Sequence, residues 1–136
     1  MSGKRPLVTV DAVVEQQDRI LLVRRGREPF RGAWALPGGF VEYGESTEEA
    51  AAREVMEEAD VAIELEGLLG VYSDPHRDPR GHVISICYVA RGRGEPMGGS
   101  DAAEARFFPL EALEDMSLAF DHAGIIRDYK RYRNVL

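Results

Sequence analysis

The stretch at residues 38–61 constrains this chain more than any other, because it joins a glycine pair to a long acidic segment. Ser46 is suited to a helix N-cap, and Glu49 three residues later completes a capping box. Residues 47–59 are good helix formers and include neither Gly nor Pro. The sequence therefore predicts a helix over 47–59, directly after a glycine loop whose backbone can approach a ligand closely.

A helical wheel divides this helix into two faces. The face expected to pack on a core carries Ala51, Ala52, Val55, Met56 and Ala59. The opposite face carries Glu54, Glu57 and Glu58, with Ala50 beside them. Glu54 and Glu58 are neighbours at i, i+4, and their like charges destabilise a helix unless a cation neutralises them. The glutamates therefore predict a Mg²⁺ site, with Mn²⁺ as the alternative, because both ions suit carboxylate oxygens.

The same stretch resembles the Nudix box, a long motif of fixed spacing. The matching positions, in order, are Gly39, Glu45, Arg53-Glu54-Val55, Glu57-Glu58 and the aliphatic Val61. Asp60 departs from the family, which usually has Gly there. This position follows the helix C-terminus, where a left-handed conformation is common, and Asp adopts that conformation more readily than most residues.

The resemblance to the Nudix family extends over nearly the whole chain. Further matching segments lie at residues 21–25, 34–39 and 105–110. The resemblance implies an α/β fold, the Nudix-type α/β/α sandwich with a mixed β-sheet, in one domain over residues 1–136. A second and shorter match, in an expected loop region at residues 72–83, resembles the ADP-ribose pyrophosphatase branch of the family.

Length and charge narrow the class of partner. With 136 residues and 44% hydrophobic content, the chain can bury one core of ordinary size. Its net charge of -7 lacks the basic footprint of a nucleic-acid binder, so we expect no nucleic-acid partner. The sequence shows no long apolar segment of the kind that forms a signal peptide or a membrane span. We therefore expect a cytoplasmic protein without a membrane partner. The single Cys87 excludes an internal disulfide and is expected in the core.

The remaining sequence predicts strands, loops and two further helices. The expected elements are strands at 7–14, 19–24, 62–72, 82–90 and 105–108, loops at 26–33 and 73–81, and helices at 109–114 and 121–132. In the last helix, Ile125, Ile126 and Tyr129 are expected to face inward. Strands and helices in this order fit a mixed sheet between helices.

For the chemistry, the resemblance implies metal-assisted hydrolysis of a nucleoside diphosphate linked to another group. Glu54 and Glu58 are expected to bind the metal, with Glu57 as a further ligand or a residue that positions water. The resemblance also implies a metal-binding carbonyl near Gly38 or Gly39, and an Arg53 that orients Glu45 or a ligand carboxylate. The general base stays open. It is either a glutamate of the box, such as Glu54, or one of two acidic residues outside the box, Glu104 and Asp101.

The substrate is expected to meet arginines and an aromatic ring. Arg24 and Arg25 end a strand, where they are either solvated or bind a phosphate, which suits a guanidinium. Arg77 and Arg80 lie in the 73–81 loop, which is either an exposed turn or a specificity loop beside the pyrophosphate or the terminal ribose. Phe30 and Tyr72 are candidates to stack on adenine.

Three functions remain open on this basis. The first is hydrolysis of ADP-ribose to AMP and ribose 5-phosphate. The second is hydrolysis of another nucleotide, such as a modified nucleoside triphosphate, which a substrate panel separates from the first. The third is a non-catalytic nucleotide-binding module, against which the intact glutamates argue. Many members of the family are dimers, so the resemblance also implies a homodimer as one option.

Overall fold

The computed structural model describes residues 4–99 and 102–135, and over these residues the chain forms one seven-stranded sheet with two α-helices and a 3-10 helix. In chain order the elements are β1 (Leu7–Gln16), β2 (Arg19–Arg25), β3 (Trp34–Ala35), β4 (Gly38–Phe40), α1 (Thr47–Ala59), β5 (Ala62–Tyr72), β6 (Val83–Arg93), β7 (Ala102–Pro109), η1 (Leu110–Asp115) and α2 (His122–Val135).

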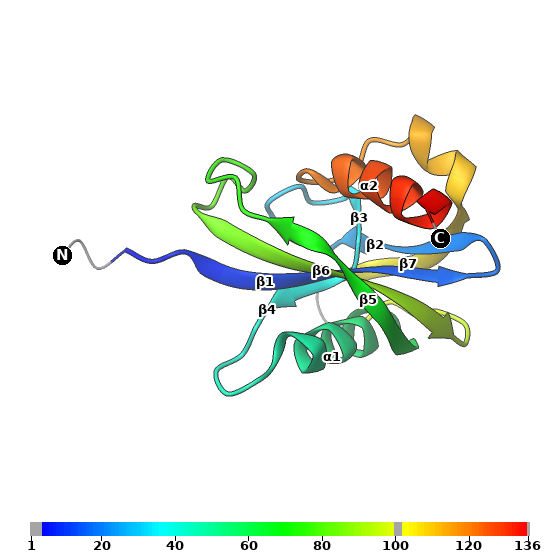
Figure 1. Ribbon diagram of the computed structural model, residues 1–136, viewed down its shortest axis with the longest axis horizontal. Coiled ribbons are helices and arrows are strands. Elements are labelled where there is room, and N and C mark those ends of the chain that lie inside the picture. The colour runs from blue at the N-terminus through cyan, green and yellow to red at the C-terminus, as the bar shows by residue number, and fades with distance from the viewer. Residues whose placement is uncertain (1–3, 100–101, 136) are drawn as a thin grey trace.

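The sheet is mixed and lies between the two helices. Its main order is β3-β2-β1-β6-β5, with β4 paired to β1 and β7 paired to β2. β1 and β6 run parallel, whereas the other pairs are antiparallel. α1 covers one face of the sheet and α2 the other (Figure 1). This arrangement confirms the predicted α/β/α sandwich. Among the described residues, neither helix is long and apolar enough to cross a membrane.

Alternation along β1 divides the core into two layers, because successive strand residues face opposite sides of a sheet. Val13 packs on the side of α2, in a cluster with Ile125 and Tyr129. Val14 packs on the side of α1, in a cluster with Val55. By the same alternation, Asp11 of β1 shares the α2 side with Val13.

The α1 helix begins as predicted, but its buried face differs from the prediction. Ser46 caps it within a complete capping box, and Asp60 after its last turn is left-handed with φ 57°. The prediction was wrong for Ala52, which is exposed, and for Met56, which is 45% exposed. Ala50, which was predicted on the face of the glutamates, is fully buried. The helix is therefore rotated so that part of its acidic face also lies against the protein.

Most of the other expected elements are confirmed with small changes. The 34–40 region forms two short strands, and β5 is bent by irregularities between Leu65 and Gly67 and between Leu68 and Gly70. The short helix after Pro109 is a 3-10 helix. Cys87 and the three predicted inward residues of α2 are buried.

The segment after β6 closes the end of α1. The Met97 N–H donates to the Ala59 carbonyl at 2.7 Å, and the Gly99 N–H donates to the Glu58 carbonyl at 3.0 Å. These bonds satisfy two of the carbonyls that every helix leaves unpaired at its C-terminus. They also fix the last turn of α1, which carries the acidic residues.

Candidate functional site

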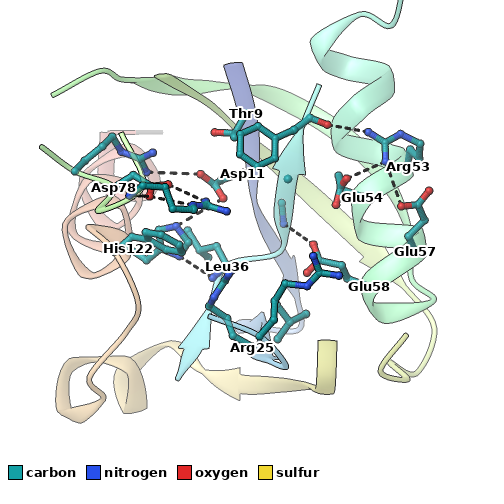
Figure 2. Close-up of a pocket in the computed structure, with 18 of the residues that line it drawn as sticks. Thr9, Asp11, Arg25, Leu36, Arg53, Glu54, Glu57, Glu58, Asp78 and His122 are labelled. Atoms are coloured by element: carbon teal, nitrogen blue, oxygen red, sulfur yellow. Dashed lines mark hydrogen bonds and ion pairs between the residues drawn. The ribbon is translucent and has the colours of Figure 1, made fainter. Parts of the chain in front are cut away.

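A cavity of about 340 Å³ lies at β4, where carboxylates, arginines and aromatic rings meet. Its volume falls within the usual range for ligand sites. The cavity brings together most of the residues that the sequence singled out, namely Gly38, Gly39, Arg53, Glu54, Glu57, Glu58, Arg25, Arg77 and Arg80. Figure 2 shows the three glutamates on one side of this cavity and Asp11, Asp78 and His122 on the other.

Two of the predicted residues are not among the described residues that line the cavity. The Arg24 Nε–H donates to the Gly32 carbonyl at 3.2 Å. Glu104 lies opposite Arg24 in the β2–β7 pairing and forms ion pairs with Arg24 and Arg106. Glu104 is therefore engaged by these arginines and is not among the described residues that line the cavity. Asp101, the other distant candidate for a general base, lies outside the described residues.

The two aromatic residues expected to stack on adenine also lie outside the cavity lining. Phe30 packs against Phe120 with ring centroids 4.8 Å apart, and Phe120, unlike Phe30, lines the cavity. The Tyr72 hydroxyl donates to Asp128 of α2 at 2.8 Å. Neither Phe30 nor Tyr72 is thus among the rings that border the cavity.

The glycine pair of β4 allows close approach from both faces of the sheet. A Cβ on Gly39 would lie 2.5 Å from the Glu54 carboxyl carbon, on the α1 side. A Cβ on Gly38 would lie 2.5 Å from Asp11 Oδ1 and 2.1 Å from the Val10 carbonyl oxygen. Because the two glycines are consecutive in a strand, their absent side chains point in opposite directions. Each glycine therefore makes room for one carboxylate.

Arg53 ties the acidic residues of α1 together. Its Nε and Nη2 donate to both oxygens of Glu45, at 2.6 and 3.0 Å, and its Nη1 donates to Glu54 at 2.8 Å and to Glu57 at 3.2 Å. Its Nη2 also donates to the Phe40 carbonyl of β4 at 3.1 Å. The hydrogen bond from Arg53 lowers the pKa of Glu45 to about 2. Arg53 therefore orients Glu54 and Glu57 and joins α1 to β4.

Glu58 lies deepest among the acidic residues of α1 that line the cavity. Its carboxylate accepts a hydrogen bond from the Gly38 N–H at 2.8 Å. The pKa of Glu58 is raised to about 8, mainly by burial and also by the charges of Glu54 and Asp11, against the opposing hydrogen bond from Gly38. The cavity thus gathers more negative charge on this side than its own groups neutralise.

These carboxylates do not yet form a finished metal cage. Over residues 4–99 and 102–135, no three Asp, Glu, His or Cys side chains are already arranged to hold an ion. Instead, Arg53 and the Gly38 N–H hold the oxygens of Glu54 and Glu58. The donor chemistry still suits a hard divalent cation, because carboxylate oxygens are the ligands that Mg²⁺ and Mn²⁺ prefer.

A buried polar network lies on the α2 side, and the sequence did not reveal it. The Ser85 hydroxyl donates to Asp11 Oδ2, and both residues are buried. The Leu36 N–H donates to His122 Nδ1 at 3.0 Å, so a neutral His122 carries its proton on Nε2. Burial lowers the pKa of His122, which favours this neutral form. Nε2 lies 3.6 Å from Asp11 Oδ1, beyond ordinary hydrogen-bonding distance.

Two arginines of the 73–81 loop take part in this network in different ways. Arg77 is engaged by both oxygens of Asp121, at 2.9 and 2.7 Å, and its side chain is 4% exposed. Arg80 is held by Asp78 but is 42% exposed. The Arg80 guanidinium lies over the Phe120 ring, 5.7 Å from its centroid. Arg77 therefore fastens the loop to α2, whereas Arg80 faces the cavity.

Several cavity residues were therefore missed at the level of sequence, among them Thr9, Asp11, Phe40, Asp78, Phe120 and His122. Asp11 offered one usable signal, because it is a charged residue at a core-facing position of an otherwise apolar strand. Asp78 and His122 offered no comparable signal, since a loop Asp and a helix-terminal His are ordinary surface residues in most chains.

Comparisons with known proteins converge on one family. The family model for the NUDIX domain matches residues 5–129. The chain is 52% identical over 130 residues to the ADP-ribose pyrophosphatase of Methanocaldococcus jannaschii, covering 95% of this chain and 76% of that protein.

Two solved structures have the same fold. The NUDIX domain of Shewanella oneidensis NrtR, complexed with ADP ribose, matches with a TM-score of 0.85 and 33% identity over 96% of this chain and 90% of that one. A bifunctional NMN adenylyltransferase/ADP ribose pyrophosphatase of Francisella tularensis, complexed with AMP and Mn ion, matches with a TM-score of 0.82 and 30% identity. This chain covers 43% of the Francisella protein, and 97% of this chain is matched.

Proposed function

This chain belongs to the NUDIX domain family, and from that premise we propose that it hydrolyses ADP-ribose to AMP and ribose 5-phosphate. One observation carries the proposal: the glutamates of α1 and Arg25 line the same cavity. A diphosphate needs this combination, because its negative charge must be neutralised and its oxygens oriented. The relative with 52% identity, which is an ADP-ribose pyrophosphatase, supports the choice of substrate.

We propose that Glu54, Glu57 and Glu58 hold a divalent cation, Mg²⁺ or Mn²⁺. When bound, such an ion neutralises diphosphate charge and activates water. The fit rests on the carboxylate donors and on the space left by Gly39, which a Cβ would fill. The Gly38 N–H points at Glu58, and the carbonyl of a strand residue points to the same side as its N–H. This supports Gly38 as a further ligand.

We also propose roles for the other charged side chains near the cavity. Arg25 is the better placed of the two strand-end arginines to bind a phosphate, because it lines the cavity and Arg24 does not. Arg53 positions Glu54 and Glu57. For the general base we favour a glutamate of α1 over Glu104, because Glu104 is not among the described lining residues. In the reaction, water attacks one phosphorus, the bridging P–O bond breaks, and the water proton passes to the base.

The test measures hydrolysis of ADP-ribose with Mg²⁺ and with chelator, beside a panel of nucleoside triphosphates. Substrates and products of every reaction, including the triphosphate panel and the chelator controls, are resolved and quantified by chromatography. The variant is Glu58→Gln, which keeps an oxygen for the Gly38 N–H. Its matched control is Glu48→Gln, the same change at an exposed position of the same helix.

We expect cleavage of ADP-ribose that requires Mg²⁺, falls by about 10³-fold or more in Glu58→Gln and stays near wild type in Glu48→Gln. Turnover of triphosphates alone would keep the metal chemistry and reject ADP-ribose as the substrate. Tight binding of ADP-ribose without turnover of any nucleotide would instead identify a binding module.

A further inference from the structure

Asp11 is a buried carboxylate at the cavity floor that the proposed reaction does not use. It is 8% exposed and lines the cavity on the α2 side of β1. The glutamates of α1 reach the same cavity from the opposite side of the sheet, as Figure 2 shows. Burying a carboxylate is unfavourable unless its oxygens find partners. The buried position of the Asp11 carboxylate therefore requires an explanation other than solubility.

The protein itself satisfies one oxygen of Asp11 and leaves the other facing the cavity. Oδ2 accepts the Ser85 hydroxyl and lies 3.9 Å from Arg77 Nη2. Oδ1 lies 3.6 Å from His122 Nε2, and within the described residues no donor forms a hydrogen bond with Oδ1. Gly38 keeps the space beside Oδ1 open, because a Cβ there would lie 2.5 Å from this oxygen.

The surroundings of Asp11 are rigid, so the direction of Oδ1 is fixed. Ser85 is fully buried on β6, which pairs with β1. His122 is held by the Leu36 N–H, and Arg77 by Asp121. These partners come from the sheet, from the 73–81 loop and from the start of α2. The carboxylate is therefore preorganised to accept a hydrogen bond, which is how a protein obtains specificity at low entropic cost.

The charges around Asp11 decide which kind of chemical group can donate a hydrogen bond to Oδ1. A phosphate is disfavoured there, because it would lie against a carboxylate. Arg77 and Arg80 balance two of the three charges of Asp11, Asp78 and Asp121, and a third guanidinium, that of Arg25, lines the same cavity. A neutral donor therefore fits better than a second cation. The nucleoside and the sugar of a nucleoside diphosphate sugar are both neutral and carry such donors.

We propose that Asp11 determines substrate specificity, and that its Oδ1 accepts a hydrogen bond from the adenine amino group or from a hydroxyl of the distal ribose. The inference rests on the proposed function for the identity of the ligand, but it concerns binding rather than hydrolysis. It assigns the glutamate side of the cavity to the diphosphate and the Asp11 side to one of the groups that flank it.

Calorimetric titration of the full chain with ADP-ribose, in chelator, tests this inference without metal or turnover. The variant Asp11→Asn keeps an oxygen for the Ser85 hydroxyl and places an amide NH₂ where Oδ1 was. The amide N–H of the variant then faces the donor group of the ligand, so we expect the dissociation constant of ADP-ribose to rise by about tenfold or more. Asp115→Asn, the same change at an exposed position of η1, is the matched control and should bind as wild type. Thermal melting establishes that each variant is folded.

Two analogues identify the donor through a cycle of residue and ligand changes. Inosine diphosphate ribose lacks the adenine amino group, and ADP lacks the distal ribose. The penalty of Asp11→Asn should disappear with the analogue that lacks the contacted donor. Unchanged affinity of Asp11→Asn for ADP-ribose, or an equal penalty with all three ligands, would overturn the proposal.

The wild-type protein supplies a second test that does not depend on the variant. At least one of the two analogues should bind about tenfold more weakly than ADP-ribose. Equal affinity of the wild type for all three ligands would overturn the proposal even if Asp11→Asn did not fold. If binding follows these expectations but Mg²⁺ gives no hydrolysis, the proposed function fails and this inference stands.

Discussion

Gly38 and Gly39 are neighbours in β4, yet they border two sides of the cavity that are built in different ways. Gly39 makes room for Glu54 on the α1 side, and Gly38 makes room for Asp11 on the α2 side. The α1 side takes its carboxylates from residues 54–58 of one helix. The α2 side takes its polar groups from β1, β6, α2 and the loops before β6 and α2.

The two sides also differ in how they balance charge. On the α1 side, burial and neighbouring carboxylates raise the pKa of Glu58 to about 8. On the α2 side, carboxylates are paired with Arg77 and Arg80. The first side therefore has the excess of acidic groups that the metal site proposed there requires. The second side is complete except for one acceptor, Asp11 Oδ1, as a recognition surface should be.

The largest expected effect comes from Gly38→Ala, which disturbs both sides at once. The new Cβ would lie 2.1 Å from the Val10 carbonyl oxygen and 2.9 Å from the Asp11 Cα. These are backbone atoms that cannot move without separating β4 from β1. We expect a loss of about 3 kcal/mol or more in the free energy of unfolding, measured with urea, together with loss of activity. Near-wild-type stability would show that β4 is not the rigid divider described above.

The next effect separates the two sides. In Gly39→Ala the new Cβ would lie 2.5 Å from the Glu54 carboxyl carbon, at the end of a flexible side chain. The fold should therefore survive while Glu54 is displaced. We expect kcat to fall by about 100-fold, because misplacing a catalytic group by about 1 Å has this effect. Affinity for ADP-ribose in chelator should change little, and a large loss of that affinity would contradict the division into two sides.

The two sides should also respond to pH in opposite directions when metal is absent. Glu58 has a pKa of about 8 in the folded protein against a model value of 4.5. The folded state therefore holds a proton that the unfolded chain has lost, and this contribution to stability is full below pH 4.5 and lost as the pH rises through 8. The pKa of His122 is lowered from 6.5, so its contribution is present above pH 6.5 and lost below it.

Urea unfolding in chelator between pH 6.5 and 8.5 isolates the Glu58 contribution, because the His122 contribution is already complete there. We expect the wild type to lose about 2 kcal/mol of unfolding free energy over this range, which is the part of the linkage that a folded-state pKa of about 8 places between these two pH values. Glu58→Gln should remove most of this pH dependence, and Glu48→Gln should retain it. A wild type whose stability does not change with pH in this range would contradict the excess of negative charge on the α1 side.

The same contrast explains how much could be predicted from the sequence. The α1 side was predicted well because its capping box, its glycine pair and its glutamates lie close together along the chain. The rotation of α1 was predicted less well, since Ala52 and Met56 are exposed. A helical wheel gives the faces of a helix, but tertiary contacts decide which one is buried. Here the Glu58 carboxylate meets the backbone of β4.

The α2 side could not be predicted because its partners are distant in sequence. Arg77 was expected at the substrate and does line the cavity, but the sequence did not reveal that Asp121, 44 residues away, holds its guanidinium. Glu104 was a candidate base, but the β2–β7 register places it opposite Arg24 instead. Asp11 stood out only as a charged residue in an apolar strand, and its partner Ser85 comes from β6, 74 residues away. Each of these outcomes depends on strand pairing or on a long-range ion pair, which leave no local pattern.

The smallest expected effect tests whether the α2 side depends on geometry or only on charge. Arg77→Lys keeps the positive charge but loses the fork that meets both oxygens of Asp121. We expect a loss of about 1–2 kcal/mol in unfolding free energy, because the Arg77 side chain is only 4% exposed. The matched control is Arg131→Lys on α2, whose side chain is 78% exposed, and its loss should stay below about 0.5 kcal/mol. Equal losses of unfolding free energy in the two variants would mean that the positive charge at residue 77 is enough to stabilise the α2 side. A larger loss in Arg77→Lys, accompanied by weaker binding of ADP-ribose in chelator, would link the 73–81 loop to the orientation of Asp11.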